Sequence, residues 1–140
     1  MTHVVAAILE RKGEILICQR KPEGAHPLKW EFPGGKVKEG ETPEAALARE
    51  LTEELGATLR KSVPIGRVVH KYAETPEELE ILFFAAAISP GDLIPRTFEK
   101  IAWILPRELG GYDFLAANAM LVANLATGRI KPAEILVSEE

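Results

Sequence analysis

The chain has 140 residues, of which 46% are hydrophobic and 27% are charged, and its formal net charge is −4. This length and composition predict one globular domain that is large enough to bury a core. No basic patch dominates this acidic chain, which argues against a nucleic-acid polymer as partner. The only cysteine, Cys18, excludes an internal disulfide and lies in an apolar run, where we expect it in the core.

The first third of the chain predicts strands, a loop and a glycine turn. Residues 4–9 and 15–19 are apolar or β-branched and flank a charged turn at 11–14, which predicts a strand–turn–strand unit. Proline and glycine predict a loop at 21–29. In residues 30–35 (WEFPGG) we expect a tight turn whose backbone faces a ligand, because glycine adopts positive φ and permits close backbone approach.

A helix is predicted to follow, with clear signals at both ends. Thr42 fits the N-cap, Pro43 fits the first helical position, and Gly56 fits the C-terminal stop. An apolar stripe that would dock on a sheet recurs every fourth residue, at Leu47, Leu51 and Leu55.

The remaining elements complete a mixed pattern. Residues 65–72 and 79–88 predict two strands, and residues 101–105 predict a short strand after a loop rich in proline and glycine. A helical turn is expected at 106–109 and a second amphipathic helix at 114–126. Strands and helices without repeats or linkers predict a single α/β domain.

The chain shows no convincing targeting or membrane segment. Residues 1–9 lack a basic start and run directly into charged residues, unlike a secretory signal. The longest purely apolar run, residues 81–88, is too short to cross a bilayer. We therefore expect a cytoplasmic protein without a membrane partner.

Three glutamates share one face of the predicted helix. Glu50, Glu53 and Glu54 lie at positions i, i+3 and i+4, which are neighbours on a helix surface. Like charges at these spacings repel, so the cluster favours a bound cation, and hard divalent cations take oxygen ligands. Because three glutamates alone more often form a solvated helix face, the choice depends on the sequence around them.

The spacing around the glutamates matches a family motif. The pattern G-x5-E-x7-REUxEExGU, in which U is apolar, is the Nudix box, and the chain therefore resembles a Nudix hydrolase. The preceding WEFPGGK run is similar to the MutT-type branch, which removes oxidised or modified nucleoside triphosphates. Every specified position of the box is matched, by Gly35, Glu41, Arg49, Glu50, Leu51, Glu53, Glu54, Gly56 and Ala57.

The resemblance implies an α/β/α sandwich built on a mixed sheet. It places a single Nudix domain at residues 1–130 and leaves open the order of a C-terminal tail at 131–140. It also implies a hydrolase of phosphoric anhydride bonds that uses Mg²⁺ or Mn²⁺ and acts on a nucleoside diphosphate linked to another group.

The resemblance also implies roles for the acidic residues. Glu50, Glu53 and Glu54 would bind the metal and act in catalysis, with Glu50 as the candidate base and the Gly34 carbonyl as a further metal ligand. Glu41 and Arg49 would brace the loop and helix by a salt bridge. Glu99 is a candidate additional ligand, although Thr97 holds the position where the family often places a glutamate.

Candidate nucleotide contacts lie outside the box. Arg20 matches the family arginine that contacts nucleotide, or it is a surface charge at a strand end. Asn118, in the MutT-like segment DFLAAN, would recognise an oxidised purine edge through its donor and acceptor groups, or would cap a helix. Phe32 and Phe83 could sandwich the base, or Leu82 and Phe84 could do so from the other face of the strand. Packing in the core is the alternative role for each of these residues.

These features lead to a Mg²⁺-dependent nucleoside triphosphate pyrophosphohydrolase that releases a nucleoside monophosphate and pyrophosphate. The favoured substrate is 8-oxo-dGTP, which implies a role in DNA repair. One alternative is a CTP or modified-dCTP pyrophosphohydrolase, because that branch shares the WEFPGGK run. Another is a Nudix-fold regulatory module that binds a nucleotide without cleaving it, although such modules usually lack box carboxylates.

Overall fold

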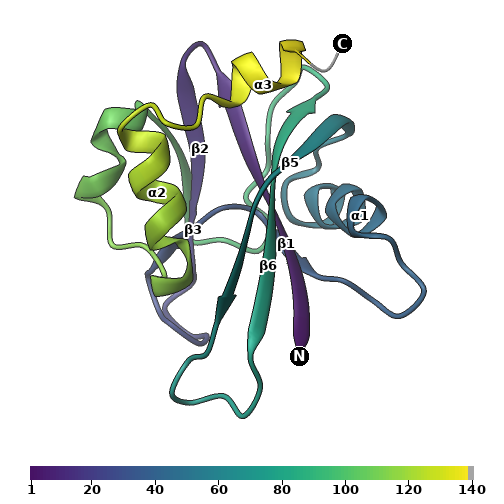
Figure 1. The fold of residues 1–140 in the computed structure, drawn as a ribbon, viewed down its shortest axis with the longest axis vertical. Coiled ribbons are helices and arrows are strands. Elements are labelled where there is room, and N and C mark those ends of the chain that lie inside the picture. Colours follow the sequence, from purple (N-terminus) through teal and green to yellow (C-terminus); the bar gives the residue numbers. More distant parts are fainter. Residues whose placement is uncertain (139–140) are drawn as a thin grey trace.

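A computed structural model describes residues 1–138 of the chain (Figure 1). Its strands are β1 (Thr2–Arg11), β2 (Glu14–Gln19), β3 (Trp30–Glu31), β4 (Gly34–Lys36), β5 (Leu59–His70), β6 (Leu79–Ile88) and β7 (Lys100–Ile104). Its helices are α1 (Pro43–Leu55), the 3₁₀ helices η1 (Pro106–Gly111) and η2 (Ala116–Asn118), α2 (Ala119–Ala126) and α3 (Pro132–Ser138).

The strands form one mixed sheet with β1 at its centre. The main order is β3-β2-β1-β6-β5, with β4 added beside β1 and β7 beside β2. β1 and β6 are parallel, while β1 runs antiparallel to β2 and β4. Every residue from Val5 to Leu9 is buried, because both faces of this central strand are covered.

Alternate residues of the sheet face two separate cores. Val5, Ala7 and Leu9 of β1 pack in the core that contains the leucine stripe of α1. Ala6 and Ile8 face the opposite core, which contains Leu121 and Leu125 of α2. Figure 1 shows α1 and α2 on opposite sides of the sheet. The expected α/β/α sandwich with a mixed sheet is confirmed.

The predicted ends of α1 are confirmed. The hydroxyl of Thr42 accepts a hydrogen bond from the N–H of Ala45 at 3.1 Å, and Pro43 is the first helical residue. Gly56 ends the helix with φ 66°, in the left-handed region that favours glycine. The glutamates of the box are therefore carried on a helix fixed at both ends and along its buried leucine stripe.

The strand expected at residues 65–72 is longer at its start and shorter at its end, because β5 spans residues 59–70. Pro64 and Gly66 would suggest that the strand is interrupted here. Instead β5 continues through both residues, with a register shift between them opposite Phe84 and Phe83 of β6. Within residues 1–138, β5 pairs with β6 alone, so it is an edge strand, where a proline is tolerated.

The helix expected at residues 114–126 begins later than predicted. Phe114 and Leu115 remain extended because they pair with Trp30, whose carbonyl accepts a hydrogen bond from the N–H of Leu115 at 3.0 Å. The chain then forms η2 and α2. Of the tail at 131–140, residues 132–138 form α3, while residues 139–140 lie outside the described part. No helix within residues 1–138 is long and apolar enough to cross a membrane.

Candidate active site

The two glycines of β4 bring the strand into close contact with its neighbours. A Cβ atom on Gly34 would lie 1.9 Å from the carbonyl oxygen of Val5, and one on Gly35 would lie 2.4 Å from the carboxylate carbon of Glu50. Neither glycine has a positive φ. The expected tight turn is thus replaced here by a short strand, and glycine is required for close approach alone.

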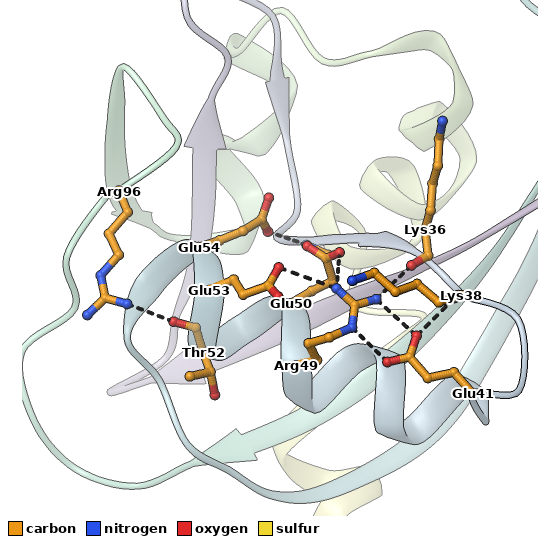
Figure 2. A network of polar contacts seen from close by, with 10 residues as sticks. Lys36, Lys38, Glu41, Arg49, Glu50, Thr52, Glu53, Glu54 and Arg96 are labelled. Atoms are coloured by element: carbon orange, nitrogen blue, oxygen red, sulfur yellow. Dashed lines mark hydrogen bonds and ion pairs between the residues drawn. The ribbon is translucent and has the colours of Figure 1, made fainter.

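Arg49 lies among the carboxylates of the box and the loop before it (Figure 2). Its guanidinium donates to both carboxylate oxygens of Glu41, at 2.7 and 2.9 Å, and to the carbonyl of Lys36 at 2.9 Å. Its Nη1 donates to Glu50 at 2.8 Å and to Glu53 at 3.3 Å. The bonds from Arg49 to Glu41, with a further bond from the N–H of Lys38, lower the pKa of Glu41 to about 2. Arg49 therefore fixes the loop to the helix and orients two of the three glutamates.

Glu54 lies deeper than its neighbours and faces β4. Its carboxylate accepts a hydrogen bond from the N–H of Gly34 at 2.9 Å. Burial raises its pKa to about 8, the charges of Glu50 and Glu31 add to that rise, and the bonds from Gly34 and Thr97 oppose it. A buried carboxyl beside two other acidic groups favours its charged form only when a cation is near.

Glu50, Glu53 and Glu54 have the chemistry of a site for a hard divalent cation. Within residues 1–138, no three acidic, histidine or cysteine side chains form a preassembled metal cluster, because Arg49 holds Glu50 and Glu53 while Gly34 holds Glu54. Mg²⁺ suits such an open carboxylate face, since it retains waters and binds substrate phosphates. The donor set and the unfavourable charge on Glu54 therefore fit a divalent metal.

The loop before β7 approaches Glu54 through Thr97. The hydroxyl of Thr97 hydrogen-bonds the Glu54 carboxyl, and the N–H of Arg96 donates to the Glu54 carbonyl at 3.0 Å. Glu99 is exposed just before β7, and its N–H donates to the carbonyl of Gln19. The structure therefore brings Thr97, rather than Glu99, to the box carboxylates.

A cavity of about 340 Å³ opens beside Gly34 and Gly35. Three of the four predicted nucleotide contacts line it, namely Arg20, Phe32 and Asn118. Arg20 donates to both oxygens of Glu31, at 3.3 and 3.1 Å, so this pair forms part of the wall. The cavity thus joins residues from distant parts of the sequence to the start of the box.

The fourth predicted contact lies elsewhere. Phe83 is fully buried and meets Phe32 edge to face, with ring centroids 6.5 Å apart, so it packs in the core and does not line the cavity. Phe84, of the alternative pair, is 1% exposed on the α1 side of the sheet. Of the predicted aromatic residues, Phe32 lines the cavity, and its ring centroid lies 5.3 Å from that of Phe114.

Asn118 is the buried polar residue of the cavity wall. The residue is 4% exposed, and within residues 1–138 its side-chain amide makes no hydrogen bond to another residue. The helix-cap alternative is not realised, because the side chain caps neither η2 nor α2. Because no buried side-chain polar atom within residues 1–138 lacks a partner, the amide keeps some access at the cavity wall, where it can bond a ligand or water.

Glu31 and Tyr72 are among the residues of this cavity wall that the sequence did not indicate as site residues. Glu31 lies within the WEFPGGK run directly before Phe32, and this position is the signal that could have indicated it. Tyr72 comes just after β5, and no pattern in the sequence shows that the hairpin it starts folds back toward Asn118.

Comparisons with known proteins identify the family. The NUDIX domain matches residues 1–130. The CTP pyrophosphohydrolase of Escherichia coli K12 is 34% identical over 143 residues, which covers 96% of this chain and 98% of that protein. The 8-oxo-dGTP diphosphatase of the same organism is 30% identical over 121 residues and covers 86% and 92%. The chain therefore belongs to the Nudix family and is a Nudix hydrolase.

Solved structures agree with this assignment. A structure from work on MutT of Aliivibrio salmonicida and Vibrio cholerae has a TM-score of 0.75 at 30% identity and covers 91% of this chain and 98% of its own. The solution structure of the E. coli ORF135 protein has a TM-score of 0.74 at 31% identity, with coverages of 92% and 91%. The MutT-like resemblance inferred from the box and the WEFPGGK run is confirmed.

Proposed function

We propose that the chain is a Mg²⁺- or Mn²⁺-dependent nucleoside triphosphate pyrophosphohydrolase, which releases a nucleoside monophosphate and pyrophosphate. The observation that carries this proposal is the position of the cavity, whose wall includes Gly34 and Gly35, the residues in contact with Glu54 and Glu50. A nucleoside bound there has its phosphates beside the box carboxylates.

The residues of the box would have different roles in hydrolysis. Glu50, Glu53 and Glu54 would hold the cation, which when bound neutralises phosphate oxygens and activates water. Glu50 would accept the proton of the attacking water, because Arg49 holds its carboxylate on the cavity side of α1 next to Gly35. Gly34 and Glu99 remain proposed further ligands, and Gly34 is the better supported through its contact with Glu54.

The favoured substrate is 8-oxo-dGTP, and Asn118 is the reason. Oxidation at C8 of guanine turns N7 from a hydrogen-bond acceptor into a donor and adds a carbonyl acceptor. A carboxamide presents an acceptor and a donor side by side, so the Asn118 amide is complementary to that altered edge. Phe32 at the wall offers a ring against the base, and Arg20, which also lines the cavity, would contact the nucleotide.

CTP or a modified dCTP is the second candidate. The relative from E. coli that is 34% identical over 143 residues is named CTP pyrophosphohydrolase. Cytosine also presents a donor beside an acceptor, so Asn118 by itself does not separate the two bases. A regulatory module that binds without cleavage is less well supported, because every box carboxylate is present.

The test is pyrophosphate release measured with Mg²⁺ over a panel of 8-oxo-dGTP, dGTP, CTP and 5-methyl-dCTP. We expect kcat/KM to be highest for 8-oxo-dGTP, and Asn118→Ala to lower that value about tenfold or more while leaving dGTP less affected. Equal turnover of oxidised and unmodified purines, with faster CTP cleavage, would transfer the assignment to CTP.

A double variant separates the enzyme from the binding module. Glu53→Gln with Glu54→Gln should reduce Mg²⁺-dependent turnover by orders of magnitude. If the wild-type protein and this variant bind a nucleotide equally and both release no pyrophosphate, the regulatory module is the correct assignment.

A further inference from the structure

Tyr72 lies at the mouth of the nucleotide cavity, just after the end of β5. It is half-buried, and it shares the cavity wall with Asn118 and Phe32. Its contacts connect three segments that are far apart in the sequence, namely the loop at residues 21–29, the β5–β6 hairpin, and η2.

The hydroxyl of Tyr72 is tied to the segment that carries Asn118. The N–H of Ala117 donates a hydrogen bond to the Tyr72 oxygen at 3.2 Å. This N–H belongs to the first turn of η2, where a backbone donor has no partner within the helix. The bond therefore fixes η2 at the residue immediately before Asn118.

The same hydroxyl has a hydrogen-bond donor that no described residue uses. A phenol oxygen accepts hydrogen bonds and also donates one. The Ala117 N–H uses an acceptor position, and within residues 1–138 the O–H of Tyr72 donates to no other group. A donor of this kind at a cavity wall is available to a ligand atom with a lone pair.

The ring of Tyr72 contacts two histidine rings. The His26 ring lies 4.6 Å from it and the His70 ring 4.5 Å from it, centroid to centroid. His26 is itself anchored, because its Nε2 lies 3.0 Å from a carboxylate oxygen of Glu74. Contacts with two neighbouring rings restrict the direction of the Tyr72 hydroxyl, and such preorganisation favours selective binding.

We propose that Tyr72 is a specificity-determining residue, whose O–H donates a hydrogen bond to an acceptor atom of the nucleobase while its oxygen holds η2 in place. This inference rests on the proposed function and adds a base contact to it. The hydroxyl and the Asn118 amide would then recognise neighbouring atoms of the same base edge.

Tyr72→Phe tests the proposal, because it removes the hydroxyl and keeps the ring. Tyr112→Phe is the matched control, since the other tyrosine of the chain packs edge to face on Trp30 at 5.3 Å and does not line the cavity. For both variants we would measure melting temperature, kcat and KM over the nucleotide panel, and the Kd of 8-oxo-dGMP, dGMP and CMP by calorimetry.

Loss of one neutral hydrogen bond corresponds to roughly 3- to 10-fold in affinity. We expect Tyr72→Phe to raise KM and Kd by about that factor for the preferred base, to reduce its preference over the other bases, and to leave kcat nearly unchanged. Tyr112→Phe should leave the preference unchanged. If Tyr72→Phe lowers the melting temperature and weakens all nucleotides equally, Tyr72 is structural and the proposal is overturned.

A second measurement needs no variant. Monophosphates that lack single base carbonyl oxygens or ring-nitrogen acceptors are titrated into the wild-type protein, and one deletion should cost a similar 3- to 10-fold. If no deletion does so, the proposal fails. If the wild-type protein neither binds nor cleaves any nucleotide of the panel, the proposed function fails with it, whereas failure in the Tyr72 measurements alone leaves the hydrolase assignment intact.

Discussion

Gly35 and the carboxylate of Glu50 are in such close contact that a single methyl group does not fit between them. A Cβ atom on Gly35 would lie 2.4 Å from the Glu50 carboxylate carbon and 2.6 Å from each of its oxygens. Glu50 could make room for such an atom only by moving its carboxylate, which would disturb its bond to Arg49 at 2.8 Å.

Gly35→Ala should therefore displace Glu50 and reduce Mg²⁺-dependent hydrolysis. A misplacement of about 1 Å in a catalytic group can cost about 100-fold in rate, so we expect kcat/KM to fall at least that far. Gly110→Ala is the control, because a Cβ atom there meets nothing within 4 Å. Retention of full activity by a folded Gly35→Ala protein would contradict the placement of Glu50 in the site.

The pKa of Glu54 predicts how stability depends on pH in the absence of metal. Its pKa is about 8 in the folded state against 4.5 as the ordinary value, so the folded protein retains a proton that the unfolded chain releases. Folding then takes up a proton between these two values, and the free energy of unfolding should fall as pH rises from about 4.5 to about 8.

Glu54→Gln should remove this dependence. In EDTA, urea denaturation of the variant and of the wild type should give similar free energies of unfolding near pH 5, and the variant should be more stable by a few kcal/mol near pH 8. Mg²⁺ should stabilise the wild type at pH 8 much more than the variant, because the cation favours the charged carboxylate. A pH-independent difference between the two would refute this assignment.

Arg49→Lys tests the bracing role of the guanidinium. A lysine keeps the charge, but it lacks the planar fork that contacts Glu41, Glu50 and Lys36 together. We expect kcat to fall about 10- to 100-fold because Glu50 loses its orientation. In an NMR titration, the pKa of Glu41 should rise from about 2 toward its ordinary value, since the bond from Arg49 is the main cause of its depression. An unchanged Glu41 titration would show that the charge alone is sufficient.

Arg96 stabilises the C-terminal end of α1 from a distant loop. No basic residue lies in the last turn of the helix, while Arg96 donates to the carbonyls of Thr52, through its side chain, and Glu54, through its backbone. A cation at the C-terminal end of a helix also interacts favourably with the helix dipole. Figure 2 shows the guanidinium directed at Thr52.

Arg96→Ala should lower the free energy of unfolding by about 1 kcal/mol, seen as a decrease in melting temperature. It should also weaken Mn²⁺ binding several-fold, because Glu53 and Glu54 belong to the last turn of α1. Arg60→Ala is the control, since Arg60 is an exposed residue of β5. If both variants melt alike, Arg96 does not cap the helix.

The sequence was sufficient for α1 and for the family. Caps, leucine spacing and carboxylate spacing all depend on residues within one helix, where positions three and four apart are neighbours whatever the rest of the chain does. The same locality explains why β6 and the ends of α1 match the prediction. The bounds of β5 and the start of α2 depend instead on distant partners. Pro64 is accepted because β5 is an edge strand, and Phe114 stays extended because Trp30 pairs with it.

Tertiary structure alone decided which side chains share the cavity. Arg20, Phe32, Tyr72 and Asn118 come from four separate segments, and nothing in their spacing along the chain places them together. It also decided that Phe32 lines the cavity whereas Phe83 does not, although the two rings touch edge to face in the same core. Local patterns determine the chemistry of the box, while packing between distant strands and loops determines which side chains line the cavity beside it.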